Sequence, residues 1–114
     1  PRIPFEKLEA PENAESSLTI RERVEKARAI QYERFAGKGI FTNAEMGSAL
    51  IREVCPLNSA SKVLLKQAVS TMHLSARAYY RLIKLARTIA DLEGASHITP
   101  AHLAEAVQYR FKTE

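Results

Sequence analysis

The sequence predicts an all-α fold, a small bundle of about five helices in one domain. Three observations support this prediction. Apolar residues recur every three to four residues in several segments, as they do on the buried face of a helix. Capping residues, glycines and prolines stand at the ends of these segments. No segment alternates as a strand does, and the apolar run Ile40-Phe41-Thr42 is too short to seed a sheet.

Length and composition indicate an ordinary globular protein. The chain has 114 residues, 46% hydrophobic and 26% charged, enough for one domain with a modest core. It contains no apolar run near the roughly 18 residues that cross a membrane, and no apolar leader segment. The single cysteine, Cys55, cannot form an internal disulfide, and we interpret it as a small buried side chain. We therefore expect a cytoplasmic fragment of a longer protein, with no membrane partner.

The net charge of +4 permits an anionic partner but does not require one. The charge is uneven along the chain. Residues 1–18 carry two Lys or Arg against four Glu, whereas residues 19–38 carry six against three. A basic helix is more often a solvated face than a nucleic-acid surface.

Residues 1–18 are predicted to be a linker, and residues 19–114 the helical domain. Three prolines are spread through the linker, and no periodicity persists there. Its apolar residues Ile3, Phe5 and Leu8 are suited to holding it against a neighbouring surface.

The first helix is expected to start near Thr19, where Thr19 and Glu22 form a capping box. The segment Gly37-Lys38-Gly39 should end it. Its apolar stripe is Val24, Ala27, Ile30 and Phe35.

Two further helices follow. A short one is predicted over residues 47–54, ended by Pro56, and a longer one over 59–72, capped by Asn58. We expect the inward residues of the short helix to be Ala49, Leu50 and Val54, and those of the longer helix to be Val63, Leu64, Ala68, Val69 and Met72.

The fourth helix is predicted over residues 75–92, with Ser75 as its N-cap rather than a nucleophile and Gly94 just after its end. A wide apolar arc predicts a central position for this helix. Of the adjacent Tyr79 and Tyr80, we expect at most one to face the core. The fifth helix is predicted from Thr99 and Pro100 to about residue 109, with Leu103, Ala104 and Val107 inward.

A basic stripe of Arg77, Arg81, Lys84 and Thr88 lies opposite that apolar arc. For Arg81 and Lys84 a solvated face is the simpler interpretation. Arg77 falls near the second helical position, beside unpaired amides and the positive end of the helix dipole. A cation there costs at most about 1 kcal/mol, so the placement has two interpretations. It is either incidental, or it marks a site where amides and guanidinium converge on an anion such as phosphate.

The residues around Arg77 closely resemble a known family. The segment 74–94, LSARAYYRLIKLARTIADLEG, resembles the C-terminal domain of magnesium-chelatase-like proteins, the bacterial YifB/ComM group of AAA+ ATPases. Further matches follow the family's order: residues 1–8, 23–31, 43–45 and 98–110, the last being ITPAHLAEAVQYR. The resemblance covers nearly the whole chain.

The resemblance implies a lid packed over the nucleotide site of an AAA+ core. Arg77, the arginine of the Leu74-Ser75-Ala76-Arg77 motif, resembles sensor 2, which would make it the catalytic and nucleotide-binding residue that reaches the γ-phosphate. It would act in its own subunit or in trans. The implied partners are the chain's own N-terminal core and neighbouring subunits of a ring, and the implied work is DNA processing, with DNA a further candidate partner.

The resemblance implies ATP and Mg²⁺ as cofactors of the full-length protein, with none expected in this fragment. The phosphate-binding P-loop motif is absent, because Gly37-Lys38-Gly39 does not match it, so the fragment alone is not expected to hydrolyse ATP. No metal site is expected, since one cysteine with His73, His97 and His102 gives no ligand spacing. Two alternatives stay open. One is a nucleic-acid-binding module using the first helix and the Arg81–Lys84 face, and the other a protein-interaction module docking through residues 1–8.

Overall fold

The computed structural model describes residues 16–113, and the side chains of residues 16–110. The predicted docking residues Ile3, Phe5 and Leu8 lie outside this range, and the division into linker and lid stays a prediction. The described residues form five α-helices and a 3₁₀ turn without a strand, which confirms the all-α prediction. In order they are α2 (Ser17–Arg34), η1 (Asn43–Glu45), α3 (Ser48–Val54), α4 (Ser59–Met72), α5 (Ala76–Glu93) and α6 (Pro100–Thr113).

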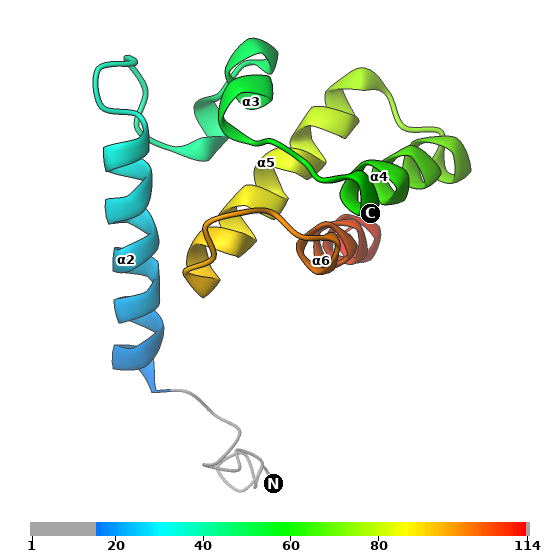
Figure 1. Cartoon of the computed structure of the whole chain (residues 1–114). Coiled ribbons are helices and arrows are strands. Elements are labelled where there is room, and N and C mark those ends of the chain that lie inside the picture. Colours follow the sequence, from blue (N-terminus) through cyan, green and yellow to red (C-terminus); the bar gives the residue numbers. More distant parts are fainter. Residues whose placement is uncertain (1–15, 114) are drawn as a thin grey trace, which may run out of the picture.

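The helix α5 occupies the centre of the bundle, as its wide apolar arc predicted. Helix α2 stands along one side of it and α6 and α4 lie on the other, while η1 contacts its C-terminal half and α3 also packs against it (Figure 1). The core is built around fully buried aliphatic side chains, among them Leu82 of α5, Leu65 of α4 and Leu103 of α6. Each such side chain stabilises the fold by about 1.5–3 kcal/mol relative to an exposed one. The start of α5 is therefore held on a rigid body.

Most helix ends follow the predicted capping residues. Asn58 accepts the Ser61 amide at 2.8 Å, and Ser75 accepts the Ala78 amide at 3.1 Å, which confirms both as N-caps. Gly94 ends α5 with a φ of 78°, a left-handed conformation that glycine adopts without strain. These caps fix where α4 and α5 begin and where α5 ends.

The predicted start of the first helix is wrong by one turn. Ser16, in an extended conformation, accepts the Thr19 amide at 3.0 Å, so α2 begins at Ser17. The expected Thr19–Glu22 box does not cap it, because Ser16 offers the same hydroxyl chemistry one turn earlier. Residues 17 and 18, assigned above to the linker, are helical.

Several inward positions also differ from the prediction. In α3, Ile51 is buried and Ala49 is exposed. In α4, Leu65 is 1% exposed whereas Val63 is 57% exposed. The buried face of α4 begins at Ser61, a polar residue that does not mark an inward position in the sequence.

Two further expectations about inward residues need correction. In α6, Ala106 and His102 are buried beside Leu103, and Val107 packs against the core as predicted, whereas Ala104 is only half-buried. Tyr79 and Tyr80 both pack against the core, half-buried, with their rings edge to face and 5.1 Å apart. Both tyrosines fit because the buried arc of α5 is wide enough to include two adjacent positions.

Candidate functional site

Arg77 lies where the sequence placed it, at the second position of α5. Ser75 caps the helix and Ala76 opens it, so the amides of Ala76 and Arg77 have no partner within the helix. The Arg77 side chain is exposed and makes no hydrogen bond or ion pair with any other described residue. A guanidinium and free amides thus share the positive end of a rigid helix, an arrangement suited to an anion.

Two hollows, of about 610 and 410 Å³, lie beside the start of α5, and Lys62, Tyr79 and Tyr80 line both of them. We call the larger hollow the α4–α5 groove. It is lined by Lys62, Leu65, Lys66 and Val69 of α4 and by Tyr79 and Tyr80 of α5. Ser75 and Ala76 also line it, so the groove reaches the residues that precede Arg77. The sequence did not reveal this groove, because it depends on how two helices pack.

The 3₁₀ turn η1 covers the C-terminal half of the predicted basic stripe, which consists of Lys84 and Thr88. Lys84 donates a hydrogen bond to the carbonyl of Ala44 at 3.0 Å, and the Thr88 hydroxyl accepts one from the Asn43 amide at 3.1 Å. Of the three stripe residues that follow Arg77, Arg81 is exposed, whereas Lys84 and Thr88 are half-buried. The solvated interpretation therefore fits Arg81 but not Lys84, and a nucleic-acid surface built on both residues loses one of them.

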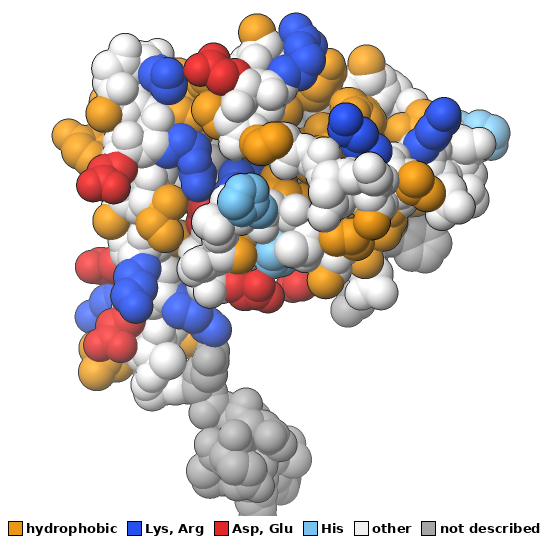
Figure 2. Space-filling model, viewed as in Figure 1, with side chains coloured by type: hydrophobic (Ala, Val, Ile, Leu, Met, Phe, Trp, Pro, Cys, Tyr) orange, Lys and Arg blue, Asp and Glu red, His pale blue; other side chains and the backbone are white. Residues whose placement is uncertain are grey.

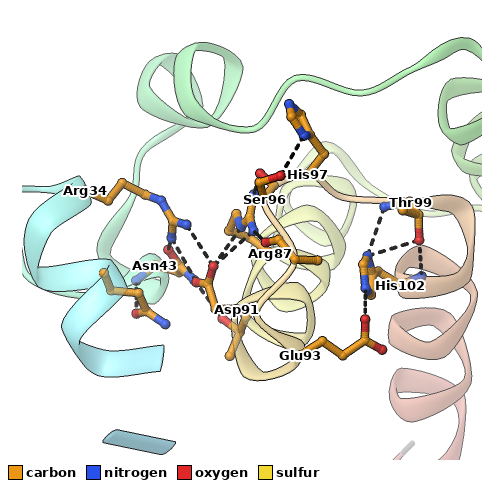
Figure 3. Close-up of polar contacts among 12 residues, drawn as sticks. Arg34, Asn43, Arg87, Asp91, Glu93, Ser96, His97, Thr99 and His102 are labelled. Carbon is orange, nitrogen blue, oxygen red and sulfur yellow. Dashed lines mark hydrogen bonds and ion pairs between the residues drawn. The ribbon is translucent and has the colours of Figure 1, made fainter. Parts of the chain in front are cut away.

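A buried ionic cluster joins α2, η1 and α5 (Figure 3). Asp91 accepts two hydrogen bonds from Arg34, at 2.8 and 2.9 Å, and one from Asn43 at 2.9 Å. Arg87 donates to the same carboxylate at 3.1 Å and to the carbonyls of Ala95 and Ser96. Two guanidiniums therefore share one carboxylate, whose side chain has no exposed surface.

The cluster controls the charge state of its members. Burial alone would raise the pKa of Asp91, but hydrogen bonds from Arg34 and Asn43 and the charge of Arg87 hold that pKa below its ordinary value. The hydrogen bond to Asp91 likewise raises the pKa of Arg34 above its ordinary value. Sequence reasoning missed this cluster. Its only local sign is the four-residue spacing of Arg87 and Asp91 within an apolar arc.

The remaining titratable candidates have structural roles. Cys55 is buried, and burial raises the pKa of its thiol, which confirms that it is a core side chain. The Thr99 amide donates to Nδ1 of His102 at 2.9 Å, so the ring proton is on Nε2 and points to Glu93 at 2.7 Å. Among the described residues no three His, Cys, Asp or Glu side chains gather as metal ligands would.

Comparison with known proteins identifies the family. Residues 14–110 match the family described as "Magnesium chelatase, subunit ChlI C-terminal". The chain belongs to this family. The match includes Arg77, the α4–α5 groove and the Asp91 cluster, and it confirms the resemblance read from the sequence.

Curated relatives agree with this assignment. Competence protein ComM of Haemophilus influenzae is 46% identical over 99 residues, covering 87% of this chain and 19% of that protein. Protein YifB of Escherichia coli, named as uncharacterized, is 44% identical over 96 residues, covering 84% of this chain and 18% of YifB. This member of the magnesium chelatase C-terminal family thus spans about a fifth of the relatives it matches. None of its described helices is long and apolar enough to span a bilayer.

Proposed function

We propose that this chain is the lid of a magnesium-chelatase-related AAA+ ATPase and that Arg77 is its sensor-2 residue. The observation that carries the proposal is the placement of Arg77, exposed and without a partner among the described residues, at the amide end of the most deeply packed helix. A lid needs a cation that is held by the fold yet free to meet a phosphate. Arg77 meets both conditions.

The chemistry of ATP hydrolysis suits such a group. As the γ-phosphoryl group transfers, negative charge is stabilised by cations placed in advance. Arginine remains charged and presents a planar set of donors to phosphate oxygens, which lysine does not. Because α5 packs in the core, its first turn would carry Arg77 as one body with the rest of the lid.

The other parts of the site belong to the proposed core. This chain has no P-loop motif, so the groups that hold ATP and Mg²⁺ would lie elsewhere in the longer protein. We extend the proposal to a ring in which Arg77 serves its own or a neighbour's nucleotide. One relative is named a competence protein, and a motor that processes DNA is the function that the family resemblance implies.

Deleting residues 16–114 from the longer protein tests this function. We expect ATP turnover to fall by about 10³-fold or more, because an arginine on the transferring phosphate has effects of that size. Binding of a fluorescent ATP analogue to the core should survive the deletion, which serves as the folding control. Unchanged turnover without the lid would contradict the proposal.

A further inference from the structure

The α4–α5 groove has a mixed character, an apolar floor with a basic rim. Leu65, Val69 and Leu74 form part of the floor, while Lys62 and Lys66 stand one helical turn apart on the α4 side. Lys62 and the two tyrosines also line the second hollow, as does Arg52. There Arg52 donates a hydrogen bond to the Tyr80 hydroxyl at 3.1 Å. The two neighbouring hollows are thus both lined by apolar side chains and bordered by cations.

None of the residues that line the two hollows is acidic. Residues 54–90, which supply α4 and most of α5, contain six Lys or Arg and no Asp or Glu. Lys62 and Lys66 are exposed, and neither forms an ion pair with a described residue. Figure 2 shows Lys and Arg side chains and no acidic ones at the right of the molecule, while acidic side chains lie over α2, along the lower edge and at the top of this view. The groove therefore suits an occupant that is both apolar and negatively charged.

The lining of the groove favours a protein segment over a nucleic acid. Single-stranded nucleic acids bind on open aromatic faces where bases stack. Here the Tyr79 and Tyr80 rings are half-buried and meet edge to face, so neither forms an open platform. Aliphatic floors instead receive apolar side chains, and basic rims pair with carboxylates.

One segment of this chain has that chemistry. Residues 1–15 contain Ile3, Phe5 and Leu8 interleaved with glutamates, four Glu in all against Arg2 and Lys7. The start of α2, which follows this segment, lies at the opposite end of the molecule from the start of α5 (Figure 1). Residues 1–15 of one copy can therefore reach the groove of a second copy more easily than they can fold back to the groove of their own copy.

We propose that the α4–α5 groove binds residues 1–15 of a second copy of this chain, with the apolar side chains on its floor and Glu6 and Glu9 paired with Lys62 and Lys66. This contact would link neighbouring copies head to tail. It does not depend on the role of Arg77, so the two proposals fail separately.

A charge swap in the chain of residues 1–114 tests the contact by analytical ultracentrifugation at low salt. The wild-type chain should self-associate in a concentration-dependent way. The double variant Lys62→Glu/Lys66→Glu should weaken association by about tenfold, because two attractive pairs become repulsive. Adding Glu6→Lys/Glu9→Lys to it should restore association to within about threefold of wild type. Lys26→Glu/Arg28→Glu, an equal charge change on exposed residues of α2, is the matched control.

Three outcomes would overturn the proposal. The first is a chain that stays monomeric up to about 1 mM, beyond which a contact has little affinity. The second is a charge swap that fails to restore association while circular dichroism shows every variant folded. The third is a Lys62→Glu/Lys66→Glu variant that loses binding to oligothymidylate with self-association unchanged, which would make the groove a nucleic-acid site.

Discussion

Replacing Asp91 by alanine is expected to destabilise the isolated chain by about 3–5 kcal/mol. The substitution leaves the buried guanidinium of Arg87 and the half-buried one of Arg34 without their shared carboxylate, and it also removes an acceptor from Asn43. Urea unfolding followed by circular dichroism measures the effect. Arg81→Ala, an exposed change on the same helix, should shift the free energy of unfolding by no more than about 0.5 kcal/mol. Equal stabilities for the two variants would show that the cluster does not join α2 to α5.

The pH dependence of the wild-type chain should report the same carboxylate. The folded pKa of Asp91 lies below the value of an unfolded aspartate, which is about 3.9. Its stabilisation is therefore complete above the unfolded pKa and is lost as the pH falls through the folded pKa. Asp91→Ala should remove this part of the acid dependence. If the free energy of unfolding of Asp91→Ala fell with decreasing pH as that of the wild type does, the acid dependence would come from other groups.

Replacing Arg77 by alanine in the longer protein is expected to lower ATP turnover by about 10³-fold or more. The reason is that charge on the transferring phosphoryl group loses a placed guanidinium, while the groups that bind the rest of the nucleotide remain. Arg77→Lys should restore little of the ATP turnover, since the ammonium group of lysine cannot make the bidentate hydrogen bonds of a guanidinium. Steady-state ATPase assays measure the loss.

Two controls separate catalysis from folding. Arg77 is exposed and lacks partners among the described residues. The urea concentration at the midpoint of unfolding should therefore be the same for Arg77→Ala as for the wild type. Arg81→Ala removes an exposed arginine one turn further along α5 and should keep turnover near wild type. Near-normal turnover in Arg77→Ala, or an equal loss in Arg81→Ala, would rule out a specific role for Arg77.

Local signals in the sequence predicted the helices and their caps. Asn58, Ser75 and Gly94 act on amides or carbonyls within a few residues, so their roles can be read without the fold. The same locality placed Arg77 at the second position of α5. The prediction was wrong at the start of α2, where a second hydroxyl residue lies close by. Ser16 caps the helix there instead of Thr19.

Features that depend on packing escaped prediction. Arg34 and Asp91 are 57 residues apart, and no local pattern pairs them. In α4 the sequence offered apolar residues on several faces, so choosing Leu65 over Val63 required knowing where α6 lies. The α4–α5 groove likewise exists only once both helices are packed. The role proposed for Arg77 requires a partner surface, and the family resemblance rather than periodicity suggested it.

The distance between the Arg77 guanidinium and the γ-phosphate tests the central claim most directly. It can be measured in a structure of the longer protein bound to a non-hydrolysable ATP analogue. We expect hydrogen-bonded nitrogen-to-oxygen distances of about 2.7–2.9 Å, to the nucleotide of its own subunit or of a neighbour. An Arg77 that faces solvent in every subunit, with the first turn of α5 away from any nucleotide, would contradict it.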